Sequence, residues 1–303
     1  MMDFRKLRYF VAVYEEGSIS RAAERENVAQ PALSVHIRQL EADMAVRLFE
    51  RSAQGVQATA AGRHFYKLCN ALLRDLATAR QEMLDFGGTI AGTIRVGLMP
   101  TICRGPLARI LDDYTRAYPK VEIAIVEAYS GTLADRVVAG DLDLAVCNRP
   151  APQTSLTMRL LFSDRVLLVS GAAKQRQPWV PCRLDEIADL KLVLPSAHHS
   201  LRRILDRQIK AGTIRPARVI EVDGLGATME FVGESDWSTM LPSTAVINDL
   251  TSGRFIMNPI AAPALSSDIY VMHPPDLPLS LPAQRIVQMI HAELLAVPGR
   301  YGL

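Results

Sequence analysis

The sequence predicts an all-α N-terminal region followed by a larger α/β region that folds as two lobes. Up to about residue 58, apolar side chains recur at helical spacing, whereas beyond Gly92 short apolar runs typical of strands alternate with amphipathic helices. The length of 303 residues is about twice that of a typical domain and accommodates both parts. We expect domains at 1–58 and 89–303, joined by a helix at 59–88.

The composition excludes several classes of protein. With 49% hydrophobic and 22% charged residues, the chain is not intrinsically disordered, and 34 Lys and Arg against 32 Asp and Glu leave a net charge of only +2. The sequence contains no run of 18 apolar residues, so we expect no membrane span. Its N-terminus lacks the apolar core of a signal peptide. The four cysteines are 34, 44 and 35 residues apart, which fits neither a CxxC metal site nor a disulfide scaffold. We expect a cytoplasmic protein with reduced thiols, no membrane association and no cofactor.

Three short helices are predicted before residue 45. The first stops at Gly17, and Ser18 can cap the second, which ends near Asn27. Pro31 lies in the first turn of the third helix, where its missing N–H costs nothing. The segment 51–57 then has the glycine and polar content of a tight β turn.

The third helix has two faces of different character. Leu33, Ile37 and Leu40 form an apolar face, and the other face carries Gln30, Ser34, Val35, His36, Arg38 and Gln39. Two short helices followed by a helix with a polar outer face are typical of a helix-turn-helix DNA reader, although tri-helical units also serve as structural bundles. Residues 1–86 contain 12 Lys or Arg and 11 Asp or Glu, so phosphate binding must rely on locally placed groups and helix N-termini.

A long helix is predicted from Thr59 to about Phe86, ending at Gly87-Gly88. Its apolar positions form two heptad series that alternate at spacings of four and three, which is typical of a coiled-coil seam. An amphipathic helix lying on its own domain is the alternative. We prefer a dimerising helix because it joins two regions of different character. The predicted dimerisation residues are Phe65, Cys69, Leu72, Leu76, Ala79 and Met83.

The α/β region divides into two series of elements and a return. The first series has strands at 94–98, 121–128 and 142–147 and helices at 106–118 and 133–139. The second has strands at 165–169, 191–194, 218–222 and 239–241 and helices at 201–211, 225–233 and 244–250. A strand at 268–272 and a helix at 282–295 return to the first series. The pattern predicts a mostly parallel sheet in two lobes, lobe I at about 89–161 and 267–303 and lobe II at about 162–266.

Several N-terminal segments resemble one family. Leu7-Arg-Tyr-Phe-Val-Ala-Val, Gly17-Ser-Ile-Ser-Arg-Ala-Ala-Glu, Ala29-Gln-Pro-Ala-Leu-Ser-Val-His-Ile-Arg-Gln-Leu-Glu, Arg47-Leu-Phe-Glu-Arg and Thr59-Ala-Ala-Gly resemble the winged helix-turn-helix of LysR-type transcriptional regulators. Length, linker helix and domain order agree over the whole chain. The resemblance implies a two-lobed effector domain like that of periplasmic binding proteins and a homotetramer built as a dimer of dimers. It also implies an inverted-repeat operator in double-stranded DNA, with RNA polymerase as a candidate partner.

The resemblance also implies DNA contacts. Gln30, Pro31 and Ser34 match contact positions at the start of the recognition helix, Arg38 lies one turn further on, and Arg51 matches the wing arginine.

Two positions depart from the family pattern. Val35 stands where many members carry a base-reading Arg, and Gln54 where the wing often has a second Arg or Lys, so we expect the operator to differ there. His36 either replaces part of this readout or contacts only phosphate or solvent. Arg47 is interpreted as a solvated surface charge.

Ligands of open α/β sheets bind at the carboxyl ends of strands, where helix N-termini favour anions. Four predicted loops follow a strand and precede a helix in this way, at 99–102, 130–132, 195–200 and 223–226. The resemblance places effector contacts in the first three. Thr101 is the leading candidate to bind a carboxylate, whereas simple helix capping is the alternative for Ser130 and Ser200. The predicted effector is a small organic acid. Its predicted contacts are Pro100, Thr101, Ser130, Ser196, His198 and Asp223.

Two further features leave alternatives open. The pair His198-His199 does not predict a metal site, because adjacent residues point apart, so an effector contact or a pH-sensitive histidine is preferred. Trp237, in a 233–242 segment that departs from the commoner family pattern, either stacks on a ligand or packs inside a lobe, and packing is preferred.

The enzyme alternatives find little support. Gly224-Leu-Gly226 is followed by Ala-Thr-Met and fails the GxGxxG pattern at its third glycine, and GxSxG, Walker and HExxH motifs are absent. A solute receptor would require a signal peptide. We therefore expect a ligand-responsive transcriptional regulator with no catalytic residues.

Overall fold

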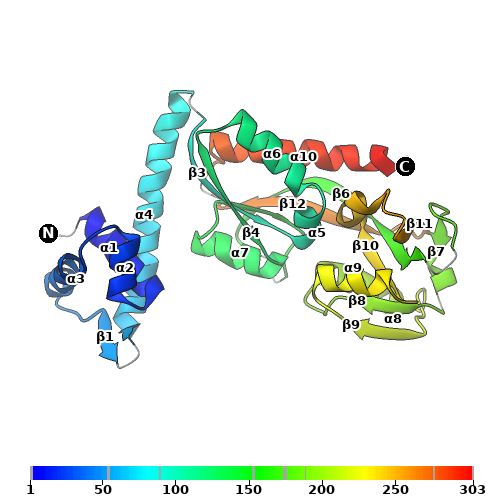
Figure 1. The fold of residues 1–303 in the computed structure, drawn as a ribbon, viewed down its shortest axis with the longest axis horizontal. Helices are drawn as coiled ribbons and strands as arrows, with labels where there is room; N and C mark the ends of the chain where they lie inside the picture. The colour runs from blue at the N-terminus through cyan, green and yellow to red at the C-terminus, as the bar shows by residue number, and fades with distance from the viewer. Residues whose placement is uncertain are drawn as a thin grey trace. The chain divides into compact units, whose positions relative to one another are not determined.

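The computed structural model describes residues 3–52, 55–88, 90–151, 154–172, 176–187, 189–275 and 277–301 (Figure 1). The chain divides into two compact units, 1–88 and 89–303. The first unit has one hydrophobic core and the second has two. Among the helices in these ranges, none is long and apolar enough to span a bilayer.

The first unit contains four helices and a two-stranded wing within the described ranges. Its elements are α1 (Phe4–Glu16), α2 (Ile19–Arg25), α3 (Gln30–Met44), β1 (Phe49–Ser52), β2 (Gly55–Ala58) and α4 (Ala60–Phe86). The helix ends follow the sequence signals. Gly17 ends α1 with a φ of 60°, which glycine adopts without strain. Ser18 accepts from the Arg21 N–H at 3.4 Å, and Thr59 Oγ1 accepts from the Gly62 N–H at 3.0 Å.

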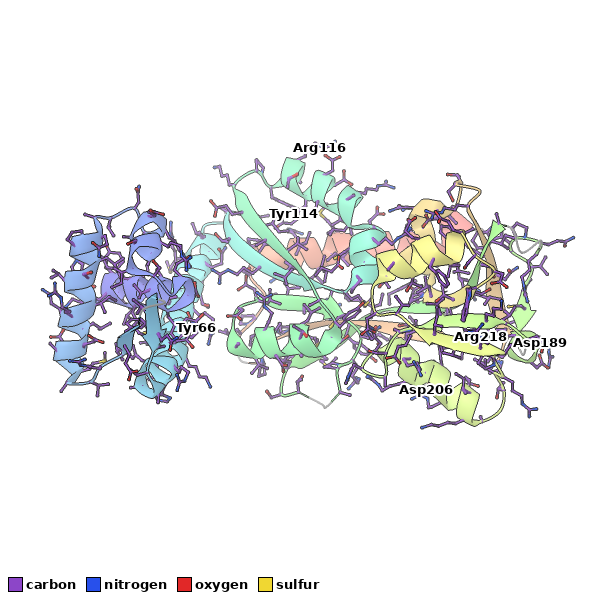
Figure 2. All side chains as sticks on the ribbon, turned by 60° about the horizontal axis from the view of Figure 1, so that its bottom comes forward. Tyr66, Tyr114, Arg116, Asp189, Asp206 and Arg218 are labelled. Carbon is purple, nitrogen blue, oxygen red and sulfur yellow. The ribbon has the colours of Figure 1, made fainter. Side chains whose placement is uncertain are left out.

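Long-range contacts position α4 and the wing on the other helices. The ring of Tyr66 on α4 (Figure 2) stacks on that of Tyr14 on α1, with centroids 3.9 Å apart. Glu41 Oε1 on α3 accepts from the Leu48 N–H at 2.8 Å and the Phe49 N–H at 3.1 Å, which fixes the start of the wing. The sequence did not single out Glu41, because its role depends on a fold between α3 and β1.

Lobe I, defined here as 90–165 and 266–301, contains a sheet covered by helices on both faces. Its elements are β3 (Gly92–Leu98), α5 (Pro100–Arg104), α6 (Leu107–Ala117), β4 (Val121–Glu127), α7 (Ser130–Ala139), β5 (Leu144–Cys147), β12 (Ser266–His273) and α10 (Leu281–Tyr301). Figure 1 shows α6 and α10 on one face and α7 on the other. Tyr114 of α6 (Figure 2) is buried and donates to the Pro282 carbonyl at 3.0 Å, which joins α6 to α10.

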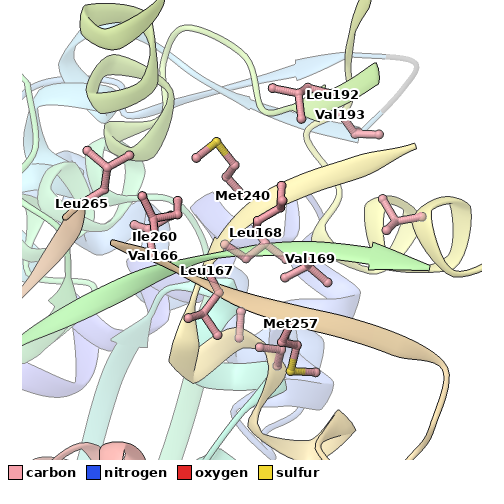
Figure 3. Packing of buried hydrophobic residues seen from close by; sticks show 14 of the residues in the cluster. Val166, Leu167, Leu168, Val169, Leu192, Val193, Met240, Met257, Ile260 and Leu265 are labelled. Atoms are coloured by element: carbon pink, nitrogen blue, oxygen red, sulfur yellow. The ribbon is translucent and has the colours of Figure 1, made fainter. Parts of the chain in front are cut away.

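Lobe II, defined as 166–265, has its own core. Its elements are β7 (Cys182–Arg183), η2 (Leu184–Ile187), β8 (Lys191–Leu194), α8 (Ser200–Lys210), β9 (Arg218–Glu221), α9 (Leu225–Gly233), β10 (Ser238–Pro242), η3 (Ser243–Asp249) and β11 (Phe255–Ala262). Figure 3 shows Leu167, Leu168 and Val169 of β6 (Thr157–Gly171) packed with Met240 and Met257 from the neighbouring strands β10 and β11.

The expectation of a mostly parallel sheet is wrong in the centre of the unit. The strand order is β4-β3-β5-β12-β6-β10-β8-β9, with β11 also paired to β6. The strand pairs at the two ends of the sheet are parallel. In the centre, β12 runs antiparallel to β5 and β6, and β6 runs antiparallel to β10 and β11. Strands β5 and β6 are therefore parallel to each other, and the parallel order is broken by β12, which returns between them from the end of the chain.

Two predicted elements change in the structure, and one strand is added. Strand β6 is longer than the predicted 165–169 and pairs with β12 through Arg165 and with β10 from Val166, so it belongs to both lobes. Strand β11 was not predicted because Asn258 and Pro259 interrupt its apolar pattern. The predicted α-helix at 244–250 is the 3₁₀-helix η3, whose first residues Ser243 and Thr244 are held by Asp164.

Candidate functional site

A cavity of about 600 Å³ lies between the two lobes of the second unit. Its walls come from segments that follow β3, β4, β8 and β9, because the carboxyl ends of these strands face the junction of the lobes. The structure brings all six predicted effector contacts into this lining: Pro100, Thr101 and Ser130 from lobe I, and Ser196, His198 and Asp223 from lobe II.

The Thr101 side chain has an unusual environment. It lies on α5, the five-residue helix that begins with Pro100 directly after β3. Its hydroxyl oxygen is buried and has no hydrogen-bond partner among the described residues. Buried polar atoms are almost always paired, so an unpaired hydroxyl in a cavity wall is a candidate ligand contact.

The capping alternative fails for Ser130 and Ser200, which both line the cavity. Helix α7 begins at Ser130, its N-cap residue is Tyr129, and no side chain caps it. Helix α8 begins at Ser200 after the N-cap His199, also without a side-chain cap. The Ser200 hydroxyl instead donates to Asn148 Oδ1 at 2.7 Å, which links α8 of lobe II to the end of β5 in lobe I.

Asp223 organises the lobe II wall. Its Oδ1 accepts from the Ser196 N–H at 2.7 Å and lies 3.1 Å from His199 Nε2. The hydrogen bond from Ser196 lowers the pKa of Asp223, so this carboxylate is ionised. Burial lowers the pKa of His199, and the neighbouring Asp223 opposes that shift.

Tyr129 connects this wall to lobe I. Its hydroxyl donates to the Asp223 carbonyl, and its ring lies edge-on to the His199 ring at 3.8 Å. Sequence reasoning missed Tyr129 and Asn148, whereas it considered His199 only as one of the pair His198-His199. Tyr129 lies beside Ser130, so adjacency to a predicted contact was its only signal.

The structure bears on two alternatives that the sequence left open. No group of three His, Cys, Asp or Glu residues suited to a metal ion occurs within the described ranges. Trp237 is 8% exposed in the lobe II core, where the Arg218 guanidinium lies 5.6 Å from the ring centre. The Trp237 side chain therefore packs inside the lobe, as preferred.

Helix α3 exposes most of the predicted DNA contacts. Gln30, Pro31, Val35 and Arg38 are exposed, and the apolar residues Leu33, Ile37 and Leu40 are buried. Arg38 Nε donates to the Ser34 carbonyl at 3.4 Å, and no other partner of its side chain occurs among the described residues.

Two positions on α3 differ from the expectation of a freely exposed polar face. Ser34 is only 9% exposed, because it adjoins the packed face that carries Leu33 and Ile37. His36 is half-buried with its ring 5.3 Å from that of Tyr9, and its Nδ1 is buried without a partner in the described part of the chain. The Arg51 side chain and Gln54 lie outside the described residues.

Helix α4 divides the predicted dimerisation residues into two groups. Cys69 is fully buried, and the Phe65 ring lies 4.9 Å from that of Phe10, so both belong to the core of their own unit. Cys69 therefore has no exposed surface to offer to an intermolecular seam, whereas Phe65 packs against this core but is only half-buried. The remaining apolar positions, extended by Leu68 and Phe86, form an exposed apolar stripe: Leu68, Leu72, Leu76, Ala79, Met83 and Phe86.

The comparisons with known proteins agree with this arrangement. Residues 4–63 match the bacterial regulatory helix-turn-helix protein, lysR family, and residues 87–295 match the LysR substrate binding domain. This chain belongs to the LysR family. It is a DNA-binding transcriptional regulator with an effector-binding domain, and not an enzyme.

Relatives of this LysR-family regulator span nearly its whole length. The nitrogen assimilation regulatory protein nac of Escherichia coli K12 is 26% identical over 290 residues, covering 95% of this chain and 94% of the relative. The transcriptional dual regulator OxyR of the same organism is 27% identical over 297 residues, covering 97% and 96%. The Haemophilus influenzae hydrogen peroxide-inducible genes activator is 26% identical over 301 residues, covering 98% of each.

Solved structures share the fold. A full-length OxyR variant from Pseudomonas aeruginosa superposes with a TM-score of 0.73 at 22% identity, covering 97% of this chain and 95% of that one. Full-length CbnR in complex with its target DNA gives a TM-score of 0.66 at 20% identity, covering 96% and 99%. At these identities the likeness concerns the fold alone.

Proposed function

We propose that a small organic acid, bound in the cavity between lobes I and II, controls this regulator. The observation that carries the proposal is the buried Thr101 hydroxyl without a described partner at the cavity wall. A carboxylate accepts hydrogen bonds from such a hydroxyl and from the free N–H groups at the N-termini of α7 and α8. Arg203, which also lines the cavity, adds a positive charge.

Thermal unfolding against a panel of small acids and their neutral amides tests the proposal. A ligand of the folded state raises its stability by about 2.7 kcal/mol at a hundredfold excess over its dissociation constant. We expect at least one acid to raise the unfolding temperature and its amide to have little effect. A panel in which only neutral compounds bind would contradict an organic acid as the effector.

Thiol-based sensing, suggested by the names of the peroxide-inducible relatives, has less support. No cysteine occurs among the residues that line the cavity within the described part of the chain. Burial raises the pKa of Cys69, Cys103 and Cys147 to about 12, which disfavours the reactive thiolate.

For the DNA-binding unit, we propose that α3 enters the major groove and that α4 pairs two units on an inverted repeat. Two such dimers would form the tetramer, and the promoter-bound assembly would act on RNA polymerase. The polar outer face of α3 and the exposed apolar stripe of α4 support this arrangement. Fluorescence anisotropy with operator DNA tests the groove assignment. Arg38→Ala should weaken binding about tenfold or more, and unchanged affinity would contradict it.

A further inference from the structure

Four side chains lie along the centre of the outer face of α3. Successive residues of an α-helix are rotated by about 100°, so positions spaced by four, three and four lie on one line. Pro31, Val35, Arg38 and Ala42 have this spacing, and all four are exposed. We call them the outward stripe. It lies opposite the buried residues of α3, so it is the part of the helix that a surface approaching α3 meets first.

Val35 is the chemically distinctive member of this stripe. It is 40% exposed, although it is apolar and stands among polar neighbours such as Arg38 and Gln39. A β-branched residue has a lower helix propensity than Arg, Lys or Gln, and Val35 is not among the buried core residues of its unit. Its restricted χ1 angle does hold two methyl groups in a defined position on the helix surface.

Arg38 lies beside Val35 on the same face. Its Nε donates to the Ser34 carbonyl at 3.4 Å, so the side chain is directed back along the helix toward the turn that carries Val35. Its terminal nitrogens have no partner in the described ranges, which leaves them available to DNA. Residues three apart on a helix are separated by about 5–6 Å, and stacked bases by about 3.4 Å. The two side chains can therefore contact base pairs that are one or two steps apart.

We infer that Val35 is a specificity-determining residue that recognises the 5-methyl group of a thymine in each half-site of the operator. In the major groove the thymine methyl is the apolar feature of the base edges, and apolar side chains recognise it by contact. Arg38 would then select a guanine within two base pairs of that thymine through its O6 and N7 acceptors. This inference rests on the proposed insertion of α3 into the major groove.

The experiment removes single methyl groups from the DNA. An operator is first selected from a randomised duplex library with the full-length protein. Each thymine is then replaced by deoxyuracil, which pairs identically but lacks the 5-methyl group, and the dissociation constant is measured at constant salt. Burial of one methyl group corresponds to about a fourfold change in affinity, so we expect that loss at one thymine of each half-site.

Two variants connect the loss to Val35. Val35→Ala should bind the thymine operator about as weakly as the wild type binds the uracil operator, and should lose nothing further on uracil. Val46→Ala is the matched control, because Val46 is 44% exposed but lies beyond the end of α3. This control should keep the wild-type difference between thymine and uracil.

Two results overturn the inference. One is equal affinity of the wild type for thymine and uracil at every position. The other is a uracil penalty that persists in Val35→Ala. Failure of the underlying proposal has a different signature: the library yields no selected sequence, or Arg38→Ala and Gln30→Ala both bind the selected operator as tightly as the wild type.

Discussion

At the scale of single residues, the two walls of the cavity differ in their hydrogen bonding. The lobe I wall carries a hydroxyl without a described partner, and the lobe II wall carries a hydrogen-bonded network. The Thr101 hydroxyl has no described partner, whereas Asp223 binds both the Ser196 N–H and the His199 ring. A buried hydroxyl without a hydrogen bond costs about 1–3 kcal/mol. A ligand that accepts a hydrogen bond from Thr101 would remove this cost.

Replacing Thr101 by Val should therefore affect stability and binding differently. The variant keeps the side-chain shape, so without ligand the free energy of unfolding should be unchanged or rise by up to about 1 kcal/mol. Affinity for an acid found in the panel should fall about tenfold. Thermal unfolding with and without the acid measures both. Thr157→Val, at the exposed start of β6, is the control. A clear loss of stability without ligand would show that the hydroxyl already has a partner.

His199 should make stability depend on pH. Burial lowers its pKa below the ordinary value of 6.5, so the unfolded chain binds a proton more readily than the folded one. The resulting stabilisation is complete above about pH 6.5 and is lost as the pH falls toward the folded-state pKa. The pKa of Asp223 is itself lowered, so this carboxylate stays ionised over that range.

We expect the wild type to lose more stability than His199→Gln between about pH 7.5 and 5.5. Urea unfolding at each pH provides the measurement. His64→Gln changes an exposed histidine on α4 and should behave like the wild type. Equal losses in the wild type and His199→Gln would contradict the prediction.

At the scale of elements, α4 shows why a heptad pattern is ambiguous. The repeat places Phe65 and Cys69 in the same series as Leu72 and Leu76, but it does not determine what covers each position. Near its start α4 packs against α1 of its own unit, whereas the large side chains of the exposed apolar stripe are 43% to 86% exposed. The first part of α4 thus contributes to a hydrophobic core, and its later part presents an exposed apolar surface.

This division predicts opposite effects for two substitutions on α4. Leu76→Arg should reduce the assembly to a smaller species, because a charge in a helix interface is not compensated, and should leave the unit folded. Cys69→Ala should lower the free energy of unfolding by about 1–2 kcal/mol without changing the assembly. Sedimentation equilibrium and urea unfolding distinguish the two. If Cys69→Ala dissociated the assembly, Cys69 would belong to the interface.

At the scale of the whole molecule, shared elements join the two lobes of the second unit. Strand β6 pairs within both lobes, and at their junction the buried Asp164 accepts four hydrogen bonds from Ser243 and Thr244. Arg104, at the end of α5, donates to the Ala245 carbonyl at 2.6 Å and forms an ion pair with Asp249. The helix that carries Thr101 is thereby bound to lobe II.

Calorimetry should consequently resolve two transitions and not three. Residues 1–88 should unfold in one and residues 89–303, despite their two cores, in the other, because β6 cannot leave one lobe without disrupting the second. An acid that binds the cavity should raise only the transition of 89–303, and operator DNA only that of 1–88. Separate melting of lobes I and II would show that the junction is weak.

Helix limits, caps, chain order and the loops that form the cavity were predictable because they depend on residues close together along the chain. Capping by Ser18 and Thr59 and the position of Thr101 after a strand are of this kind. The tertiary structure alone decided the burial of Ser34 and Cys69, the antiparallel centre of the sheet and the link from Tyr129 to Asp223 across 94 positions. These features depend on which surfaces meet in space, and periodicity shows that a face is apolar or polar without showing what covers it.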